Sequence, residues 1–139
     1  MDKFVVGFAY TNDGRVLLME KRRPKWQRGF LNGIGGKMEA DETPRAAMTR
    51  ESMEEAGLDL EWAYRGILRG LNYDGRPFEC HLFYAYDARV KKFKQMEDEA
   101  LGLYQTSDIH NHHILNHLNF LIPFGLCNDR TLFMQLDYW

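Results

Sequence analysis

The sequence predicts an α+β fold in a single domain that spans residues 1–139. Three observations predict it. Short β-type segments dominate the chain, one helix with clear start and stop signals interrupts them, and a second helical segment precedes a last strand. At 139 residues with 45% hydrophobic composition, the chain is long enough to bury one core. The expected order is two strands, helix, further strands, helix and strand, which favours a sheet covered by helices.

The first two strands are expected at residues 3–10 (KFVVGFAY) and 15–22 (RVLLMEKR). They flank Asn12-Asp13-Gly14, a turn sequence that suits a hairpin because glycine accepts a positive φ. A basic and aromatic connection follows at residues 22–30, and then a glycine-rich segment at residues 32–37 (NGIGGK). Such a segment lets the backbone approach an anion or a metal ion closely.

The helix is expected between Thr43 and Gly57. Thr43 can cap its start, Pro44 suits the first helical position and Gly57 can end it. After it, residues 62–73 and 77–88 look like strands joined around Asp74-Gly75. Residues 112–122 (HHILNHLNFLI) are expected to be helical up to the following proline, and residues 131–139 to form the last strand.

Charge and cysteine content limit the classes of partner and the cellular setting that the sequence predicts. A formal net charge of −2 and a pI near 6.2 give no basic field for a nucleic-acid polymer, so a small-molecule partner is expected. Cys80 and Cys127 lack CxxC spacing, and the N-terminus has no secretory pattern, which indicates a reducing, cytoplasmic setting. No apolar run approaches the roughly 18 residues that span a membrane.

Three carboxylates gather at the end of the expected helix. Glu51, Glu54 and Glu55 are spaced i, i+3 and i+4, so they share one face, where they repel each other and oppose the helix dipole. A solvated helix face is one interpretation of such a charge run. The other is a site for a hard divalent cation, because Mg²⁺ takes oxygen ligands and reverses the repulsion. With Lys37 beside the glycine-rich segment, the set describes a metal–phosphate site.

Residues 36–58 read GKMEADETPRAAMTRESMEEAGL, a pattern that resembles the Nudix box. Its glycine, glutamate, arginine and aliphatic positions fall in register at Gly36, Glu42, Arg50, Glu51, Glu54, Glu55, Gly57 and Leu58. The departure is Ser52, where an aliphatic residue is usual. The resemblance implies an α/β/α sandwich with a mixed sheet between helices.

The resemblance also implies roles for individual residues. It implies that Glu51, Glu54 and Glu55 hold Mg²⁺ or Mn²⁺ together with the carbonyl oxygen of Gly35, and that Glu51 assists the attacking water. It assigns Arg50 and Glu42 to an ion pair that orients the helix. Family members recruit a further carboxylate from a later loop, where the candidates are Glu97, Asp98 and Glu99, and Glu99 has the best spacing to the apolar residues that follow.

The reaction implied is hydrolysis of a nucleoside diphosphate linked to another group. The NGIGGK segment resembles the MutT-like branch that sanitises the nucleotide pool, which implies a purine nucleoside triphosphate such as 8-oxo-dGTP, cleaved to the monophosphate and pyrophosphate. Asn32 and Asn116 are the candidates for contact with the base, and each could instead stabilise a turn or a helix end. Basic side chains could neutralise the phosphates: Arg22, Arg23, Lys25 and Lys37.

Other functions stay open. ADP-ribose or a dinucleoside polyphosphate is the main alternative substrate, and a non-catalytic module that senses nucleotides is the alternative class of protein. A zinc site among His110, His112, His113 and His117 is conceivable, but no cysteine or HExxH pattern supports it. The aromatic residues Trp26, Tyr73 and Tyr104 could stack on a base or belong to the core. The protein is expected to be a monomer or a homodimer.

Overall fold

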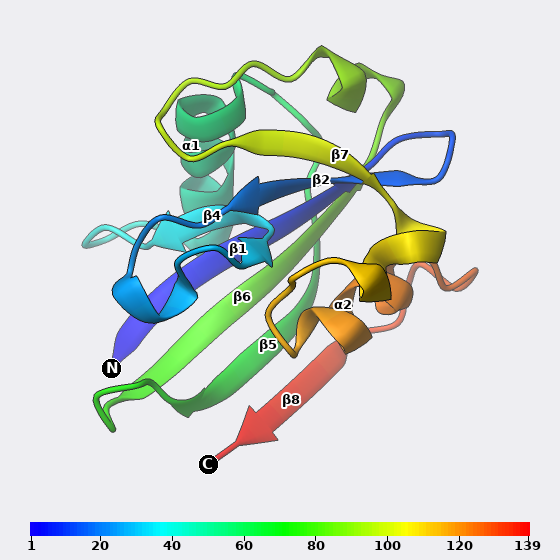
Figure 1. The fold of residues 1–139 in the computed structure, drawn as a ribbon. Helices are drawn as coiled ribbons and strands as arrows, with labels where there is room; N and C mark the ends of the chain where they lie inside the picture. Colours follow the sequence, from blue (N-terminus) through cyan, green and yellow to red (C-terminus); the bar gives the residue numbers. More distant parts are fainter.

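The computed structural model describes residues 1–139 apart from the side chain of Tyr138. The described residues form an eight-stranded mixed sheet and two α-helices (Figure 1). The strands are β1 Asp2–Tyr10, β2 Arg15–Glu20, β3 Leu31–Asn32, β4 Ile34–Lys37, β5 Ala63–Leu71, β6 Pro77–Tyr86, β7 Leu101–Gln105 and β8 Met134–Tyr138. The helices are α1 Pro44–Ala56 and α2 Leu118–Gly125, with short 3-10 helices η1 Lys25–Gln27, η2 Ala88–Lys92 and η3 Thr106–Asn111.

The strand order is β3-β2-β1-β6-β5-β8, while β4 pairs with β1 and β7 pairs with β2. The expected hairpins are confirmed, since β1 pairs with β2 and β5 with β6 in antiparallel fashion. The central pair β1 and β6 is parallel, and so is the pair β5 and β8. Parallel neighbours need a crossover connection, and α1 lies within the connection from β1 to β6.

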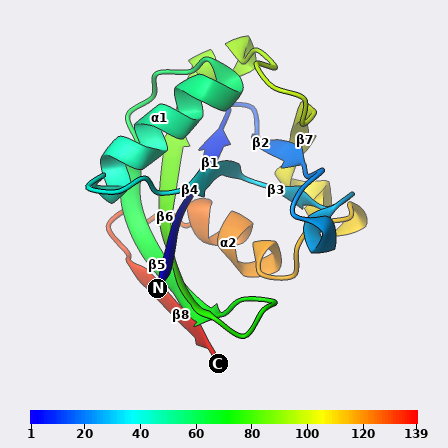
Figure 2. The ribbon, with the colours of Figure 1, turned by 90° about the vertical axis from the view of Figure 1, so that its left-hand side faces the viewer.

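Two apolar layers lie on opposite faces of the sheet. Along β1, Val5 and Ala9 belong to the layer beneath α1, whereas Val6 and Phe8 belong to the layer beneath α2. This alternation follows from the two-residue period of a strand. Figure 2 shows α1 and α2 on either side of the central strands. The predicted α/β/α sandwich is confirmed.

Local signals define α1 as expected. The Oγ1 atom of Thr43 accepts a hydrogen bond from the Ala46 N–H at 3.1 Å. Gly57 ends the helix at φ 65°, and its N–H donates to the Met53 carbonyl at 3.1 Å. Ser52, fully buried on this helix, donates its hydroxyl hydrogen to the Leu58 carbonyl at 2.7 Å. The polar residue at an apolar position of the box therefore stabilises the helix end.

The predicted helix at residues 112–122 is wrong in its bounds. The N–H of Leu31 donates to the His113 carbonyl at 2.8 Å, and the Leu115 N–H donates to the Leu31 carbonyl at 3.3 Å. This pairing with β3 holds residues 113–115 outside the helix, so α2 begins only at Leu118. The helix then continues through Pro123 to Gly125, because its buried apolar side chains pack on the sheet. None of the described helices combines the length and apolar character needed to cross a membrane.

Candidate functional site

Two glycines bring the strand β4 against both β1 and α1. A side chain at Gly35 would place its Cβ 2.0 Å from the Val5 carbonyl oxygen, so the strand can lie this close only with glycine there. A Cβ at Gly36 would lie 2.6 Å from Oε1 of Glu51. Gly35 therefore lets β4 lie close to β1, and Gly36 leaves the room that the Glu51 carboxylate occupies.

The three carboxylates of α1 have different surroundings. Glu51 and Glu55 are only 9% and 6% exposed, whereas about half of the Glu54 side chain is exposed. The Gly35 N–H donates to Oε1 of Glu55 at 2.8 Å. Burial, together with the negative charge of Glu51, raises the pKa of Glu55 to about 8. Burial also raises the pKa of Glu51.

Arg50 clamps this end of the helix. Its Nε and Nη2 donate to the two carboxylate oxygens of Glu42 at 2.6 and 3.0 Å, and Nη2 also donates to the Lys37 carbonyl at 3.2 Å. Its Nη1 donates to Glu51 at 2.9 Å and to Glu54 at 3.2 Å. The guanidinium lowers the pKa of Glu42 to about 2. The structure thus places the expected pair Arg50 and Glu42 in direct, two-pronged contact.

The carboxylate set has the charge and the oxygen donors that a divalent cation needs. Glu55 forms no salt bridge within the described residues, and the Arg50 guanidinium stands between Glu51 and Glu54 as a positive group. Raised pKa values mark carboxylates whose charges lack full compensation, which a cation would supply. No group of three His, Cys, Asp or Glu side chains converges in metal-binding geometry among the residues described. In this arrangement the Glu54 carboxylate is held by Nη1 of Arg50 at 3.2 Å.

The later acidic loop docks on the end of α1. The N–H groups of Lys94 and Met96 donate to the carbonyls of Ala56 and Glu55 at 2.9 and 3.3 Å, which satisfies the last carbonyls of the helix. The negative charge of the exposed Glu97 raises the pKa of both Glu51 and Glu55. The charge of Glu97 therefore adds to those of the two buried helix carboxylates.

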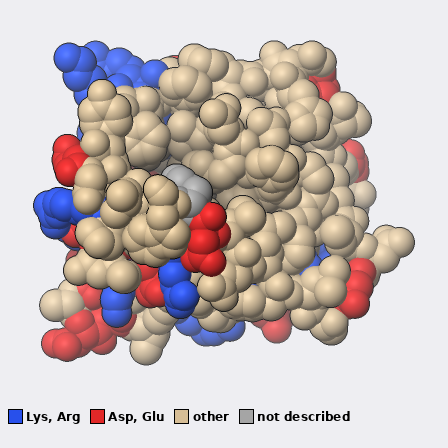
Figure 3. Space-filling model, turned by 90° about the horizontal axis from the view of Figure 1, so that it is seen from below, with Lys and Arg blue, Asp and Glu red and all other residues tan. Residues whose placement is uncertain are grey.

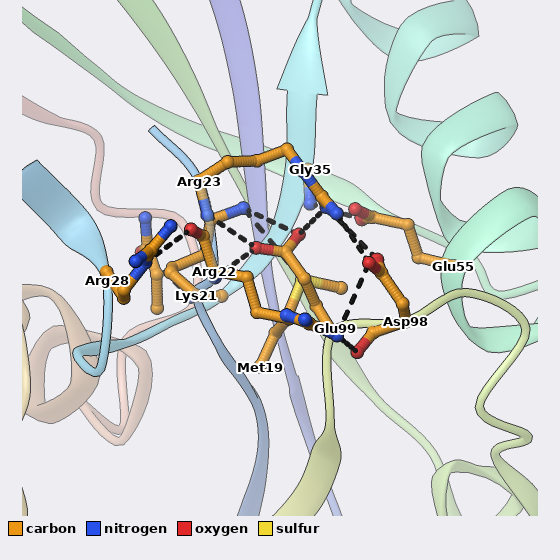
Figure 4. A network of polar contacts seen from close by, with 11 residues as sticks. Met19, Lys21, Arg22, Arg23, Arg28, Gly35, Glu55, Asp98 and Glu99 are labelled. Atoms are coloured by element: carbon orange, nitrogen blue, oxygen red, sulfur yellow. Dashed lines mark hydrogen bonds and ion pairs between the residues drawn. The ribbon is translucent and has the colours of Figure 1, made fainter. Parts of the chain in front are cut away.

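Glu99, the residue selected from the sequence, has other partners (Figure 4). Its Oε1 contacts the Lys21 ammonium at 3.1 Å, and its Oε2 accepts from the backbone N–H groups of Arg22 at 2.6 Å and Arg23 at 3.3 Å. Burial alone would raise the pKa of Glu99, but these donors and the charge of Lys21 lower it. Lys21 also acts on Glu55 by its charge. Sequence reasoning missed Lys21, whose only signal was its place in a basic run.

The predicted basic residues lie in two groups. Arg22 and Arg23 contact Asp98 in the acidic loop, at 3.5 and 2.6 Å. Lys37 instead lies at the end of β4, where its ammonium is 3.6 Å from Asp2. Lys25 belongs to η1, in the same loop as the two arginines. Seen from below, charged side chains of both signs gather mainly at the left and lower left, an acidic group lies near the middle, and further charged groups lie along the right margin (Figure 3).

The two candidate asparagines differ in their contacts. The side-chain oxygen of Asn32 accepts from the Gly33 N–H at 2.8 Å, so it supports the local backbone, and its amide nitrogen has no partner within the described residues. Asn116 is exposed just before α2, and its backbone carbonyl accepts from the Asn119 N–H at 3.1 Å. Asn32 therefore keeps two donors for a ligand, next to the glycines of the site.

The aromatic and histidine candidates are spread over separate contacts. Trp26 and Tyr73 are both exposed and lie nearly parallel, with ring centroids 6.5 Å apart. The histidines do not converge. His113 packs on Phe30, and burial lowers the pKa of His117 to about 4.

Comparison with known proteins agrees with this geometry. The family model described as NUDIX domain matches residues 3–115. The chain is 38% identical over 83 residues to CTP pyrophosphohydrolase of Escherichia coli (strain K12), covering 60% of this chain and 62% of that protein. It is 35% identical over 83 residues to oxidized purine nucleoside triphosphate hydrolase of Danio rerio, covering 48% of this chain and 53% of that protein. The chain thus spans less than two thirds of either curated relative.

A solved structure extends the likeness to nearly the whole chain. The MutT protein of Bacillus halodurans matches with a TM-score of 0.73 at 20% identity, over 99% of this chain and 90% of the other. At that identity the match shows the shared fold. The family match covers residues 3–115, which contain the carboxylates, the glycines and the Arg50 clamp described above. This chain therefore belongs to the NUDIX domain family.

Proposed function

We propose that this protein is a metal-dependent nucleotide pyrophosphohydrolase. The observation that carries the proposal is the pair of buried carboxylates, Glu51 and Glu55, packed against Gly35 and Gly36 with raised pKa values. Such an arrangement suits a bound divalent cation and a phosphate chain beside it. The names of the two curated relatives, which both refer to nucleoside triphosphate chemistry, support the same activity.

We assign Glu51, Glu54, Glu55 and the carbonyl oxygen of Gly35 to binding Mg²⁺ or Mn²⁺. When bound, such an ion neutralises charge on the phosphate oxygens and on the leaving group. Glu51, whose pKa is raised by burial, accepts the proton of the attacking water. Arg50 holds Glu51 in place through Nη1 and ties the helix to Glu42.

The hydrolysis itself balances with water as the only co-reactant. The water oxygen bonds to a phosphorus of the phosphate chain, the bridging P–O bond breaks, and pyrophosphate departs from the nucleoside monophosphate. The cations Arg22, Arg23 and Lys37 compensate the negative charge of the chain, and their exposure leaves them accessible to it.

For the base, we propose a purine, with 8-oxo-dGTP as the preferred triphosphate. The free amide donors of Asn32 beside the site support this choice, since an asparagine amide suits a purine edge. Asn116 is the second base-contact candidate, exposed before α2. CTP is the second candidate substrate, favoured by the 38% identity to the Escherichia coli relative.

A hydrolysis screen tests the proposal. The purified protein is incubated with Mg²⁺ and 8-oxo-dGTP, ordinary triphosphates including CTP, ADP-ribose and dinucleoside polyphosphates, and products are separated by chromatography. We expect monophosphate and pyrophosphate from a triphosphate, no turnover in EDTA, and at least a ~10²-fold lower kcat for Glu55→Gln. Tight nucleotide binding without turnover of any compound would refute the proposed enzyme activity and indicate a module that senses nucleotides. Turnover of ADP-ribose at least about tenfold more efficient than that of every triphosphate would overturn the assignment of a triphosphate substrate.

A further inference from the structure

The loop between β2 and β3 carries Arg22 and Arg23, and two neighbouring acidic residues hold it in different ways (Figure 4). Glu99 is buried and binds the start of the loop mainly through its backbone, and Nη1 of Arg23 also lies 3.7 Å from its Oε1. Both of its oxygens are engaged, by the N–H groups of Arg22 and Arg23 and by the Lys21 ammonium. Replacing these bonds with water would mean exposing a side chain that is only 6% accessible.

Asp98 holds the side chains of the same loop, and it does so at the surface. Its two oxygens accept from Nη1 and Nη2 of Arg23 at 3.1 and 2.6 Å, and Arg22 lies 3.5 Å from the same carboxylate. About half of each partner is exposed to solvent. An exposed ion pair contributes little to stability and exchanges readily with other ions.

The place that Asp98 fills is one that suits a phosphate group. A guanidinium that binds a carboxylate with two parallel N–H donors can bind a phosphate in the same way. Beside it lies an open hollow of about 510 Å³, lined by Arg22, Arg28 and the backbone of Gly29. Lys21, which Glu99 already pairs, and the acidic Glu20 line it as well. Asp98 and Arg22 line this hollow, and Arg23 reaches it only through its pair with Asp98, so an anion that enters the hollow meets the carboxylate that holds both arginines.

We propose that Glu99 and Asp98 divide two roles: Glu99 permanently anchors the arginine loop, and Asp98 is a displaceable stand-in for the terminal phosphates of the substrate. The inference rests on the proposed function, because it takes a polyphosphate as the ligand. It makes Glu99 a positioning residue, in place of the metal-ligand role that the sequence predicts. A metal ion on Glu99 would have to share its oxygens with the Lys21 ammonium 3.1 Å away, and the two positive charges would repel.

The role of Asp98 is tested by calorimetric titration with inorganic tripolyphosphate in EDTA, where no hydrolysis is involved. We expect Asp98→Asn to tighten binding about two- to fivefold, because the competing carboxylate charge is removed. The matched control is Asp87→Asn, which removes the same charge from the two-pronged Asp87–Arg89 pair on another part of the surface. The control should leave the tripolyphosphate affinity unchanged within a factor of about 1.5.

A double variant makes this test specific to the loop. Arg23→Ala alone should weaken tripolyphosphate binding at least about threefold. In the Arg23→Ala background, Asp98→Asn should lose most of its effect on tripolyphosphate binding, because the guanidinium for which Asp98 competes with the anion is no longer there. Unchanged or weaker binding in Asp98→Asn, or the same gain with and without Arg23, would overturn the displacement role.

The role of Glu99 is tested with Glu99→Gln, which keeps the shape and one acceptor oxygen. We expect faster amide hydrogen exchange at Arg22 and Arg23 and at least about threefold weaker tripolyphosphate binding. The Mn²⁺ affinity, measured by electron paramagnetic resonance, should stay within about twofold of the wild type. A Mn²⁺ affinity lowered tenfold with unchanged amide exchange would make Glu99 a metal ligand and overturn the anchor.

These measurements separate the two proposals. Tripolyphosphate and Mn²⁺ binding do not require turnover, so a protein that hydrolyses no nucleotide can still show the expected pattern in the variants. In that case the proposed activity fails and the division of roles stands. If the protein hydrolyses nucleotides normally but its tripolyphosphate affinity does not depend on Asp98, the proposed activity stands and the displacement role of Asp98 fails.

Discussion

Glu55 should make the metal-free protein less stable as the pH rises, and Glu55→Gln should remove that effect. Its ordinary pKa of 4.5 is raised to about 8 in the folded protein by burial and by the charge of Glu51. Between those two values the folded chain holds a proton that the unfolded chain has lost. The free energy of unfolding therefore falls as the pH rises through this window and does not fall further above it.

The size of the effect follows from the same two values. A difference of one pKa unit corresponds to about 1.4 kcal/mol, so a rise from 4.5 to about 8 sets an upper bound of roughly 5 kcal/mol. Water and the nearby cation of Lys21 can relax around the charge, and we expect about 2 to 4 kcal/mol. For a domain of this size that corresponds to a difference in Tm of roughly 6 to 12 °C at pH 9.

The assay is thermal unfolding in EDTA at a series of pH values from 4.5 to 9. Glutamine keeps the acceptor for the Gly35 N–H, so only the titratable charge is lost. The Tm of the wild type and of Glu55→Gln should be similar near pH 4.5, and the variant should be more stable near pH 9. Glu54→Gln, at an exposed position on the same helix, is the control and should follow the wild type. Parallel Tm curves for Glu55→Gln and the wild type across this range would refute the assignment of a buried, uncompensated charge.

Four further predictions concern the same site. Arg50→Ala should lower both the Tm and kcat, since it breaks the contacts to Glu42 and Glu51, and unchanged melting and turnover would refute the clamp. The apparent Mn²⁺ affinity should weaken up to about tenfold per unit below pH 8, because Glu55 must release a proton; a titration flat from pH 6 to 8 would argue against this. Ser52→Ala should cost about 1 to 3 kcal/mol in chemical denaturation, because the Leu58 carbonyl loses a buried donor, and an unchanged midpoint would contradict it. Asn32→Ala should lower kcat/KM for 8-oxo-dGTP by a factor that corresponds to about 1 to 3 kcal/mol of lost transition-state binding, and it should leave kcat/KM for a pyrimidine triphosphate nearly unchanged. An equal loss for both substrates would show that Asn32 does not contact the base.

Pairing between strands far apart in the chain could not be predicted from the sequence. The short strands β3, β4 and β7 are specified by partners in β1 and β2, and their own residues read as a glycine-rich segment and an acidic loop. The same pairing set the start of α2, because Leu31 binds residues 113–115. An apolar helical pattern cannot show which of its residues a distant strand will hold.

What the sequence determined by itself is local. The first hairpin and α1 follow from turn, cap and spacing signals within a few residues, and the spacing of Glu51, Glu54 and Glu55 fixed that they share a helix face. Only the tertiary structure decided which of them are buried and where the later loop places its acids. Glu97, Asp98 and Glu99 are neighbours in sequence, yet Glu97 acts by its charge on the helix carboxylates, Asp98 pairs with two surface arginines, and Glu99 accepts from the backbone N–H groups of Arg22 and Arg23. The physical reason is that a carboxylate's role depends on the donors and charges that folding brings to it from elsewhere in the chain.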